Sequence, residues 1–157
     1  MFQVLSKLTS LCEALRGNIE MITLRWVRRV QSDPYLKSDD HLTLTQIVDH
    51  VPQMLDELCE IFESEEEPDF EAIRASSQHG YIRAAEGYSL TELLRELELL
   101  RDCVFDFIVE VEIEQNFSRD DAVRALHRVN EYFSEDIIFV VEHYLSRQKS
   151  SGKLESE

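Results

Sequence analysis

The amino-acid sequence predicts a single all-α domain, and three observations lead to this fold class. Only 4 glycines and 3 prolines interrupt the 157 residues, which favours long helices over strands joined by tight turns. Apolar residues recur every three or four positions along most of the chain, as on one face of a helix. A chain of this length can bury one core without disulfides or metals. We expect this domain to cover residues 1–146, followed by a disordered tail or linker at residues 147–157, where the sequence is almost entirely polar.

The first predicted helical segment covers residues 4–31. Its apolar side chains, which include Trp26, recur at helical spacing, and Gly17 is a position at which the segment can divide into two helices. Pro34 ends the segment, because the residue before a proline is pushed out of the helical region. A polar loop should follow.

Two further helices are expected between residues 43 and 86. Thr43 or Thr45 can cap the first of them, and Pro52 should bend this helix or mark its true start. An acidic loop follows. The second of these helices should begin near Pro68 and end at about residue 86, since the fixed backbone angle of proline suits a first helical turn.

A helix stop followed by a capping box predicts where the next helix begins. Gly87 supplies a helix stop, and Ser89 and Glu92 form a capping box, in which each side chain binds the backbone N–H of the other residue. This helix should run to about residue 115, and a final helix should follow Ser118.

The last two helices carry more apolar surface than one core needs. The final helix should end near Leu145 or Ser146. Beyond their core-facing stripes, the two helices share a second apolar stripe, made of Leu99, Cys103, Phe107, Val123, Ile138, Val141 and Leu145. We expect this second stripe to form a homodimer interface in a four-helix bundle. The alternative is that the first or second helix covers it within one chain.

The chain is strongly acidic. Acidic residues outnumber basic ones by 32 to 16, and the formal net charge is −16. This charge repels nucleic-acid phosphates and anionic lipid headgroups, so neither nucleic acid nor a membrane is an expected partner. The N-terminal region lacks the continuous apolar run of a signal peptide or membrane span. The cysteines, Cys12, Cys59 and Cys103, should be reduced core residues, and we expect a cytoplasmic protein.

The stretch HGYIRAAEGYSLTELLRELELLR, at residues 79–101, has the residue types of an active site. His79 is the obvious candidate base, but the spacing supplies neither an orienting partner nor a nucleophile, so we expect no catalytic residue here. The 5 histidines form no HxxxH or HExxH pair and no ligand spacing with a cysteine, so we expect neither a metal nor another cofactor.

Two alternatives keep a role for this region. A helical bundle can hold haem or an apolar ligand, yet haem needs a histidine on a short helix before the last two helices, and residues 87–89 leave no room for one. Histidine phosphotransfer would use His79 with Gly80 and Arg83, although this spacing does not guarantee the cation that a phosphoryl group requires. A visible absorption spectrum tests the first alternative, and phosphorylation of His79 by a kinase tests the second.

A structural role explains more of the same residues. Arg83 lies about one turn before Gly87 and Glu96 about two turns after Ser89, so the two charged groups can face each other across a tight helix hairpin. A partly buried arginine–carboxylate pair would fix the register of the two helices. Tyr88 should pack beneath this corner.

The sequence also resembles a known family. The stretch VDHVPQMLDELCEIF at residues 48–62, the earlier Trp26 and SDP at residues 32–34, and residues 79–101 resemble the RsbRD N-terminal domain family. These domains are the N-terminal helical modules of RsbT co-antagonists in the bacterial stress response and of many sensor histidine kinases. The resemblance extends from about residue 19 to residue 144. Its signature residues are His79, Gly80, Arg83, Gly87, Tyr88, Ser89, Glu96 and Arg101.

The resemblance implies a fold and a function. The fold would be a non-haem, globin-like bundle of five to six helices that dimerises through its last two helices. The function would be that of a sensor or regulatory input module in signal transduction, without catalytic activity of its own. Its partners would be a second copy of the chain and a downstream output domain or signalling protein, such as a STAS domain or a kinase core. That output would follow residue 157 in a longer protein, or the module would act alone.

Overall fold

The structure is a computed structural model that describes residues 2–37, 42–48, 50–64, 83 and 87–154. Every regular element in these ranges is an α-helix, which confirms the predicted fold class. The helices are α1 (Phe2–Gly17), α2 (Ile19–Ser32), α3 (Leu44–Val48), α4 (Val51–Glu63), α6 (Leu90–Gln115) and α7 (Arg119–Leu154). Apart from Arg83, the helix expected at residues 68–86 lies outside the described residues.

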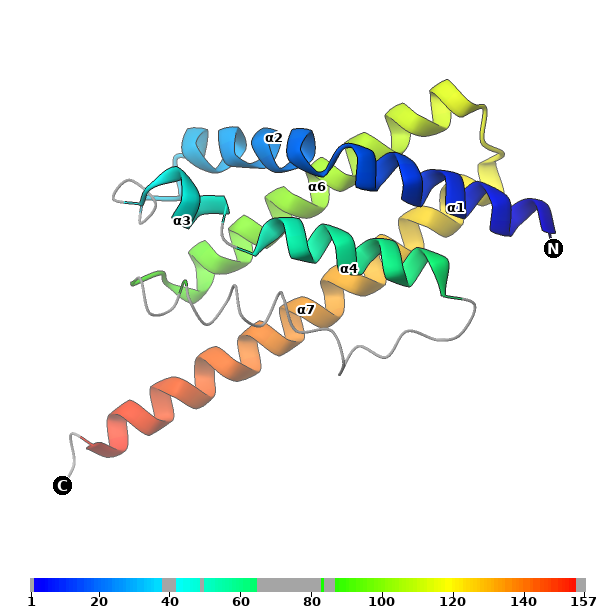
Figure 1. Ribbon diagram of the computed structural model, residues 1–157. Coiled ribbons are helices and arrows are strands. Elements are labelled where there is room, and N and C mark those ends of the chain that lie inside the picture. The colour runs from blue at the N-terminus through cyan, green and yellow to red at the C-terminus, as the bar shows by residue number, and fades with distance from the viewer. Residues whose placement is uncertain (1, 38–41, 49, 65–82, 84–86, 155–157) are drawn as a thin grey trace.

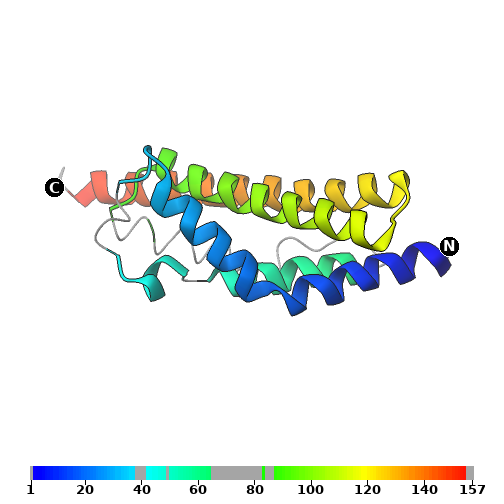
Figure 2. The same cartoon turned by 90° about the horizontal axis from the view of Figure 1, so that it is seen from above.

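The helices pack in two layers. Figure 2 shows α6 and α7 side by side in one layer, α1, α3 and α4 in the other, and α2 crossing between them. The core lies between the layers, where Trp26, Leu58, Leu97 and Phe133 are at most 1% exposed. The last turns of α7 run past the other labelled helices (Figure 1).

The first predicted segment divides where the sequence allows it to. Helix α1 ends at Gly17, and α2 begins after Asn18, whose side-chain amide donates to the Ala14 carbonyl at 2.8 Å. At the other end of α2, Asp33 adopts an extended backbone with φ −77° and ψ 121°. This is the conformation that the following Pro34 imposes, because its ring excludes a helical residue before it.

The second predicted helix is in fact two helices. Thr43 caps α3, since its hydroxyl accepts from the Gln46 N–H at 3.3 Å. The chain then restarts as α4, with Pro52 in the first turn. Proline is tolerated there because the first N–H groups of a helix have no intrahelical partner. Pro52 therefore marks the true start of α4.

The predicted capping box is present at the start of α6. The Ser89 hydroxyl accepts from the Glu92 N–H at 3.2 Å, and the Glu92 carboxylate accepts from the Ser89 N–H at 3.0 Å. Helix α6 ends at Gln115, and its C-cap Asn116 adopts the left-handed conformation with φ 53°. Asparagine tolerates this conformation better than other residues with a side chain, so the chain can turn sharply into α7.

Helix α7 is longer than the sequence predicts. Ser118 caps its start by accepting from the Asp121 N–H at 3.2 Å. The expected end near residue 145 is wrong, because the helix continues to Leu154. No proline interrupts residues 146–154, and three serine hydroxyls in the extension donate to the carbonyls four residues back; these are Ser146, Ser150 and Ser151. Residues 147–154, which were expected to be part of a disordered tail or linker, belong to this helix.

Part of the second apolar stripe is covered within the chain. Leu99, Cys103 and Phe107 are at most 8% exposed. Helix α2 lies over this flank of α6 and is fixed there by ion pairs from Arg25 to Glu110 and from Arg29 to Asp106. These three interface candidates are therefore not available at the surface, as in the alternative in which an early helix covers the stripe.

The cysteines lie in the core without disulfides. All three are buried and free, as expected. The Cys12 thiol on α1 donates to the Cys59 carbonyl on α4 at 3.3 Å, so the two helices cross closely at this point. Burial raises the pKa of Cys59 and Cys103 to about 11. These thiols therefore carry little of the reactive thiolate at neutral pH.

An exposed ion pair fastens α1 to α4. Arg16 donates to the Glu63 carboxylate at 2.6 Å and to the Asp56 carboxylate at 3.3 Å. The hydrogen bond from Arg16 lowers the pKa of Glu63 below its ordinary value of 4.5. The pair therefore contributes fully at neutral pH, and its contribution is lost as the pH falls through the lowered pKa of Glu63.

We predict that Glu63→Gln lowers the free energy of unfolding by about 0.5 kcal/mol at pH 7, the scale of a solvent-exposed pair. The difference from the wild-type protein should shrink as the pH falls below 4.5, where wild-type Glu63 becomes protonated. Urea unfolding at several pH values measures it. Glu60→Gln is the matched control, because Glu60 is exposed on the same helix and makes no ion pair within the described residues. A pH-independent difference would contradict the prediction.

Candidate functional site

The corner before α6 places Arg83. Gly87 has φ +89°, a conformation that favours glycine because it has no side chain. The Tyr88 N–H donates to the Arg83 carbonyl at 3.0 Å, which closes the turn in the way typical of a glycine helix stop. The predicted stop at Gly87 is therefore present, and it directs the Arg83 side chain toward α6.

The Arg83 guanidinium is enclosed by acceptors from two helices. Its Nε donates to Glu96 Oε2 at 2.9 Å, so the ion pair expected from the sequence is present. Its two terminal nitrogens donate to the carbonyls of Gln46 at 2.8 Å and Ile47 at 2.6 Å. Both charged side chains are 0% exposed. Each guanidinium nitrogen thus has an acceptor, which offsets the cost of burying the charge.

The two carbonyls belong to α3, which is only five residues long. The last carbonyls of any helix have no partner within it and carry a partial negative charge. In α3 this set includes Gln46 and Ile47. Arg83 satisfies them from another part of the chain. The arginine therefore fixes α3 as well as α6.

Two aromatic residues extend this network. The Trp26 indole on α2 donates to the Glu96 carbonyl at 3.0 Å, and Trp26 is completely buried. The Tyr88 ring lies 5.2 Å from the Arg83 guanidinium carbon, within the range of a cation–π contact. The Tyr144 hydroxyl on α7 donates to the Tyr88 carbonyl at 3.3 Å. The corner therefore contacts α2, α3, α6 and α7.

The signature residues separate into three groups in the structure. Arg83, Gly87, Tyr88, Ser89 and Glu96 meet at the corner described above, whereas Arg101 lies farther along α6. His79 and Gly80 lie outside the described residues. The phosphotransfer alternative depends on these two residues, so it lies outside them as well. The Arg83–Glu96 pair is sealed from solvent, so it suits a structural role rather than contact with a diffusing substrate.

Sequence reasoning missed three partners of this corner. Trp26, the α3 carbonyls and Tyr144 lie far from residues 83–96 in the chain, and their contacts exist only after the helices pack. One signal was present: Pro52 allowed a new helix start. A helix ending before Pro52 has free carbonyls that need a donor.

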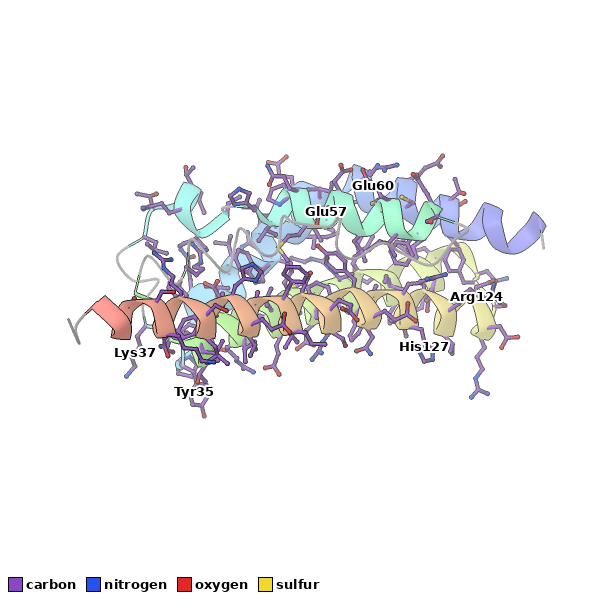
Figure 3. The ribbon with its side chains drawn as sticks, turned by 90° about the horizontal axis from the view of Figure 1, so that it is seen from below. Tyr35, Lys37, Glu57, Glu60, Arg124 and His127 are labelled. Atoms are coloured by element: carbon purple, nitrogen blue, oxygen red, sulfur yellow. The ribbon has the colours of Figure 1, made fainter. Side chains whose placement is uncertain are left out.

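The outward side of α7 is the second feature of the site. Val123, Ile138 and Leu145 are between 44% and 52% exposed, and Val141 is half-buried. With Asn130 and Ser134 between them, these positions share a sector of about 80° on the helix. On the other side of α7, the Tyr132 hydroxyl donates to Glu57 at 3.0 Å. Figure 3 shows Glu57 on α4, a helix that packs against α7. One side of α7 therefore contacts the fold, and the other is open.

Helix α6 contributes to the same open face. Val109 is 44% exposed, and Phe105 is half-buried beside it. Two polar atoms on this flank, Arg101 Nε and Glu112 Oε1, are buried without a hydrogen-bond partner. Burial raises the pKa of Glu112. We call this surface of α6 and α7 the open face: Arg101, Phe105, Val109, Glu112, Val123, Asn130, Ser134, Ile138, Val141 and Leu145.

A groove lies elsewhere, at the junction of α1 and α2. Its volume is about 430 Å³, and it is lined by Gly17, Asn18, Glu20, Met21, Leu24, Arg25 and Arg28. The lining is mixed and open to solvent, unlike the apolar chamber that haem or an apolar ligand would need. Within the described ranges, no three potential ligand side chains gather in a way that could hold a metal ion. None of the helices described here could span a bilayer.

We predict that Glu96→Ala lowers the free energy of unfolding by about 3–5 kcal/mol, because it leaves the Arg83 charge buried and uncompensated. Arg83→Ala should have a similar effect. The double variant should lose less than the sum of the two, since removing both charges leaves neither one unpaired. Urea unfolding followed by circular dichroism measures all three.

Glu110→Ala is the matched control for the corner. Glu110 lies on the same helix and pairs with Arg25 at 2.9 Å, but the two side chains are 50% and 37% exposed. Its loss should therefore cost no more than about 1 kcal/mol. If the corner variants were as stable as the wild-type protein, the structural role of the pair would be wrong.

The comparisons with known proteins bear on these same residues. The family model described as the RsbT co-antagonist protein RsbRD N-terminal domain matches residues 20–154. No curated protein and no solved structure matches the chain significantly. The matched range starts in α2 and contains the whole corner and the open face. The chain therefore belongs to the RsbRD N-terminal domain family.

Proposed function

We propose that this protein is a cytoplasmic, dimeric and non-catalytic input module of bacterial signal transduction, coupled to a kinase or STAS output. The family suggests a regulatory signalling input domain. The observation that carries the finer proposal is α7, a single helix from Arg119 to Leu154 with an exposed apolar stripe along it. A helix of this kind can both join two copies and carry a change in packing away from the core.

The open face supports a dimer with a second copy. Exposed Val123, Ile138 and Leu145 lie on one side of α7, and exposed Val109 lies on α6, the helix against which α7 packs. A helix hairpin with an apolar outer face can complete a four-helix bundle by packing against an identical hairpin. In the globin-like arrangement implied by the family, these would be the last two helices of each chain.

The corner supports transmission to α7. Tyr144 joins α7 to the Tyr88 carbonyl, ten residues before α7 ends at Leu154. A shift of α2, α3 or α6 at the Arg83–Glu96 pair would therefore reach α7 through Tyr88. A signal can change this arrangement only by its difference in affinity for the two packings. The corner would thus set the direction in which α7 leaves the dimer.

We predict that the wild-type chain is a dimer at high micromolar concentration and that Ile138→Lys is a monomer. Ile138 is 52% exposed within the apolar stripe, so a lysine there would bury a charge in the interface. Multi-angle light scattering measures both. Leu24→Lys is the control, because Leu24 is 41% exposed on α2, away from the open face, and this variant should remain dimeric. A monomeric wild-type chain would overturn the dimer.

We predict that the kinase activity of a chimaera depends on the helical phase of α7, that is, on how far its last residues are rotated about the helix axis. A dimeric kinase core is joined after Leu154, and one to seven alanines are inserted after Ser146, within the helical extension. Each inserted residue rotates the following helix by about 100°, so kinase activity should change with a helical period and recover near seven insertions. The same insertions in a flexible linker placed between Leu154 and the kinase core are the control. A flat response to the insertions in α7 would contradict transmission through this helix.

A further inference from the structure

Arg101 is a charged residue on the open face for which the described part of its own chain provides no acceptor. Its Nε is buried and without a hydrogen-bond partner, and no ion pair of Arg101 is formed within the described residues. The residue is nevertheless only half-buried, so the rest of its side chain can reach a molecule outside the chain. A buried donor without an acceptor is costly and rare in a folded protein. The buried Nε itself cannot be reached from outside, so the acceptor that we expect from a partner would bind the terminal nitrogens of Arg101, which are not buried and make no hydrogen bond within the described residues.

The polar part of the α7 stripe lies about as far from the turn between α6 and α7 as Arg101 does. Arg101 is 16 residues before Phe117 in the turn, and Ser134 is 17 residues after it. At 1.5 Å per residue, both lie about 25 Å from the turn of the antiparallel hairpin (Figure 2). Asn130 lies one turn nearer to the turn. Arg101, Asn130 and Ser134 thus form a polar level within the open face.

The acceptors at this level are also unused within the chain. Asn130 and Ser134 are exposed, and neither side chain makes a hydrogen bond within the described residues. Ser134 differs in this from Ser146, whose hydroxyl donates to its own helix four residues back. Both side chains offer oxygen acceptors to a guanidinium. The level therefore holds a donor and acceptors that do not satisfy one another in one chain.

The apolar part of the stripe indicates how a second copy would lie. Ile138, Val141 and Leu145 gather at the exit end of α7, whereas Val123 lies near the turn, at a distance from it similar to that of Val109 of α6. A two-fold axis along the hairpin keeps this distance, so that Val123 of each copy faces Val109 of the other, apolar against apolar. A perpendicular axis would instead place the exit end of one copy against the turn end of the other and would separate these two valines. The first arrangement packs α6 of one copy against α7 of the other, in antiparallel order.

This arrangement brings the unused groups together, and the inference rests on the dimer of the proposed function. The geometry points to an intersubunit polar level in which Arg101 of each protomer donates to Asn130 and Ser134 of its partner. Two such contacts form in each dimer, related by the two-fold axis. The level lies within the otherwise apolar open face.

A polar level of this kind would fix the register of the dimer. Apolar helices can slide by one turn at little cost, because one leucine or isoleucine contact resembles the next. A slide by one turn removes Arg101 from its acceptors and leaves the guanidinium buried and unpaired. The level would therefore select one packing of α6 against the partner's α7.

The test uses two complementary variants of the whole chain, Arg101→Glu and Ser134→Arg. In a Ser134→Arg homodimer, each new arginine faces the partner's Arg101, which should weaken the dimer by at least about tenfold. When the two variants are mixed, the new glutamate of one chain faces the new arginine of the other. The ratio of the squared heterodimer concentration to the product of the two homodimer concentrations should therefore exceed its statistical value by at least about tenfold. Native mass spectrometry of chains with different tags measures this ratio.

The control mixture contains Arg124→Glu and Glu142→Arg. Both residues are exposed and share a flank of α7 outside the open face, so this mixture should stay binomial. A binomial mixture of the Arg101 and Ser134 variants, with a dimeric wild-type chain, would overturn the polar level and leave the dimer in place. A monomeric wild-type chain would overturn both.

The same mixture distinguishes a variant that has lost only the intersubunit contact from a variant that does not fold. A variant that fails to fold cannot be rescued by a second misfolded chain, so preferential heterodimers require both chains to be folded. Circular dichroism of each variant alone provides the second measurement, and helical spectra like that of the wild type are expected. If both variants are helical and neither enriches the heterodimer, the proposed contact is wrong.

Discussion

The fold depends on keeping one arginine charge buried. Arg83 is 0% exposed and uses its guanidinium nitrogens on a carboxylate of α6 and on two carbonyls of α3. A buried ion pair is weak support for stability when replaced as a whole, but losing a single partner is severe. The corner therefore contributes more to specifying which helices pack together than to the total free energy of unfolding. It specifies which helices meet, because the three acceptors of one guanidinium come from α3 and α6.

The local parts of this corner were predictable from the sequence. The glycine stop at Gly87, the capping box from Ser89 and the facing of Arg83 and Glu96 depend on residues within about four helical turns of one another. Over such distances helix geometry fixes the relative positions of side chains. The extended residue before Pro34 was predictable for the same reason, since a proline ring acts only on its neighbour.

The remainder could not be predicted because it depends on packing between distant segments. The α3 carbonyls became acceptors only because α3 ends early, and Trp26 reaches Glu96 across 70 positions of sequence. The second apolar stripe shows the same limit. Periodicity identified both halves of the stripe, but only the structure shows that α2 covers the half that contains Cys103 and leaves the half that contains Ile138 open.

Helix α6 has three sides that make different contacts. One side receives α2 through arginine–carboxylate pairs such as Arg25 with Glu110, and a second side packs on α7. The third side carries Arg101 beside the apolar Phe105 and Val109, and Arg101 is partly buried and has no hydrogen-bond partner for its Nε. The buried pair at Glu96 and the unpaired Arg101 lie on one rigid helix, less than two turns apart. A displacement at the corner therefore moves the open face by a similar amount, so α6 can couple the buried network to whatever packs outside it.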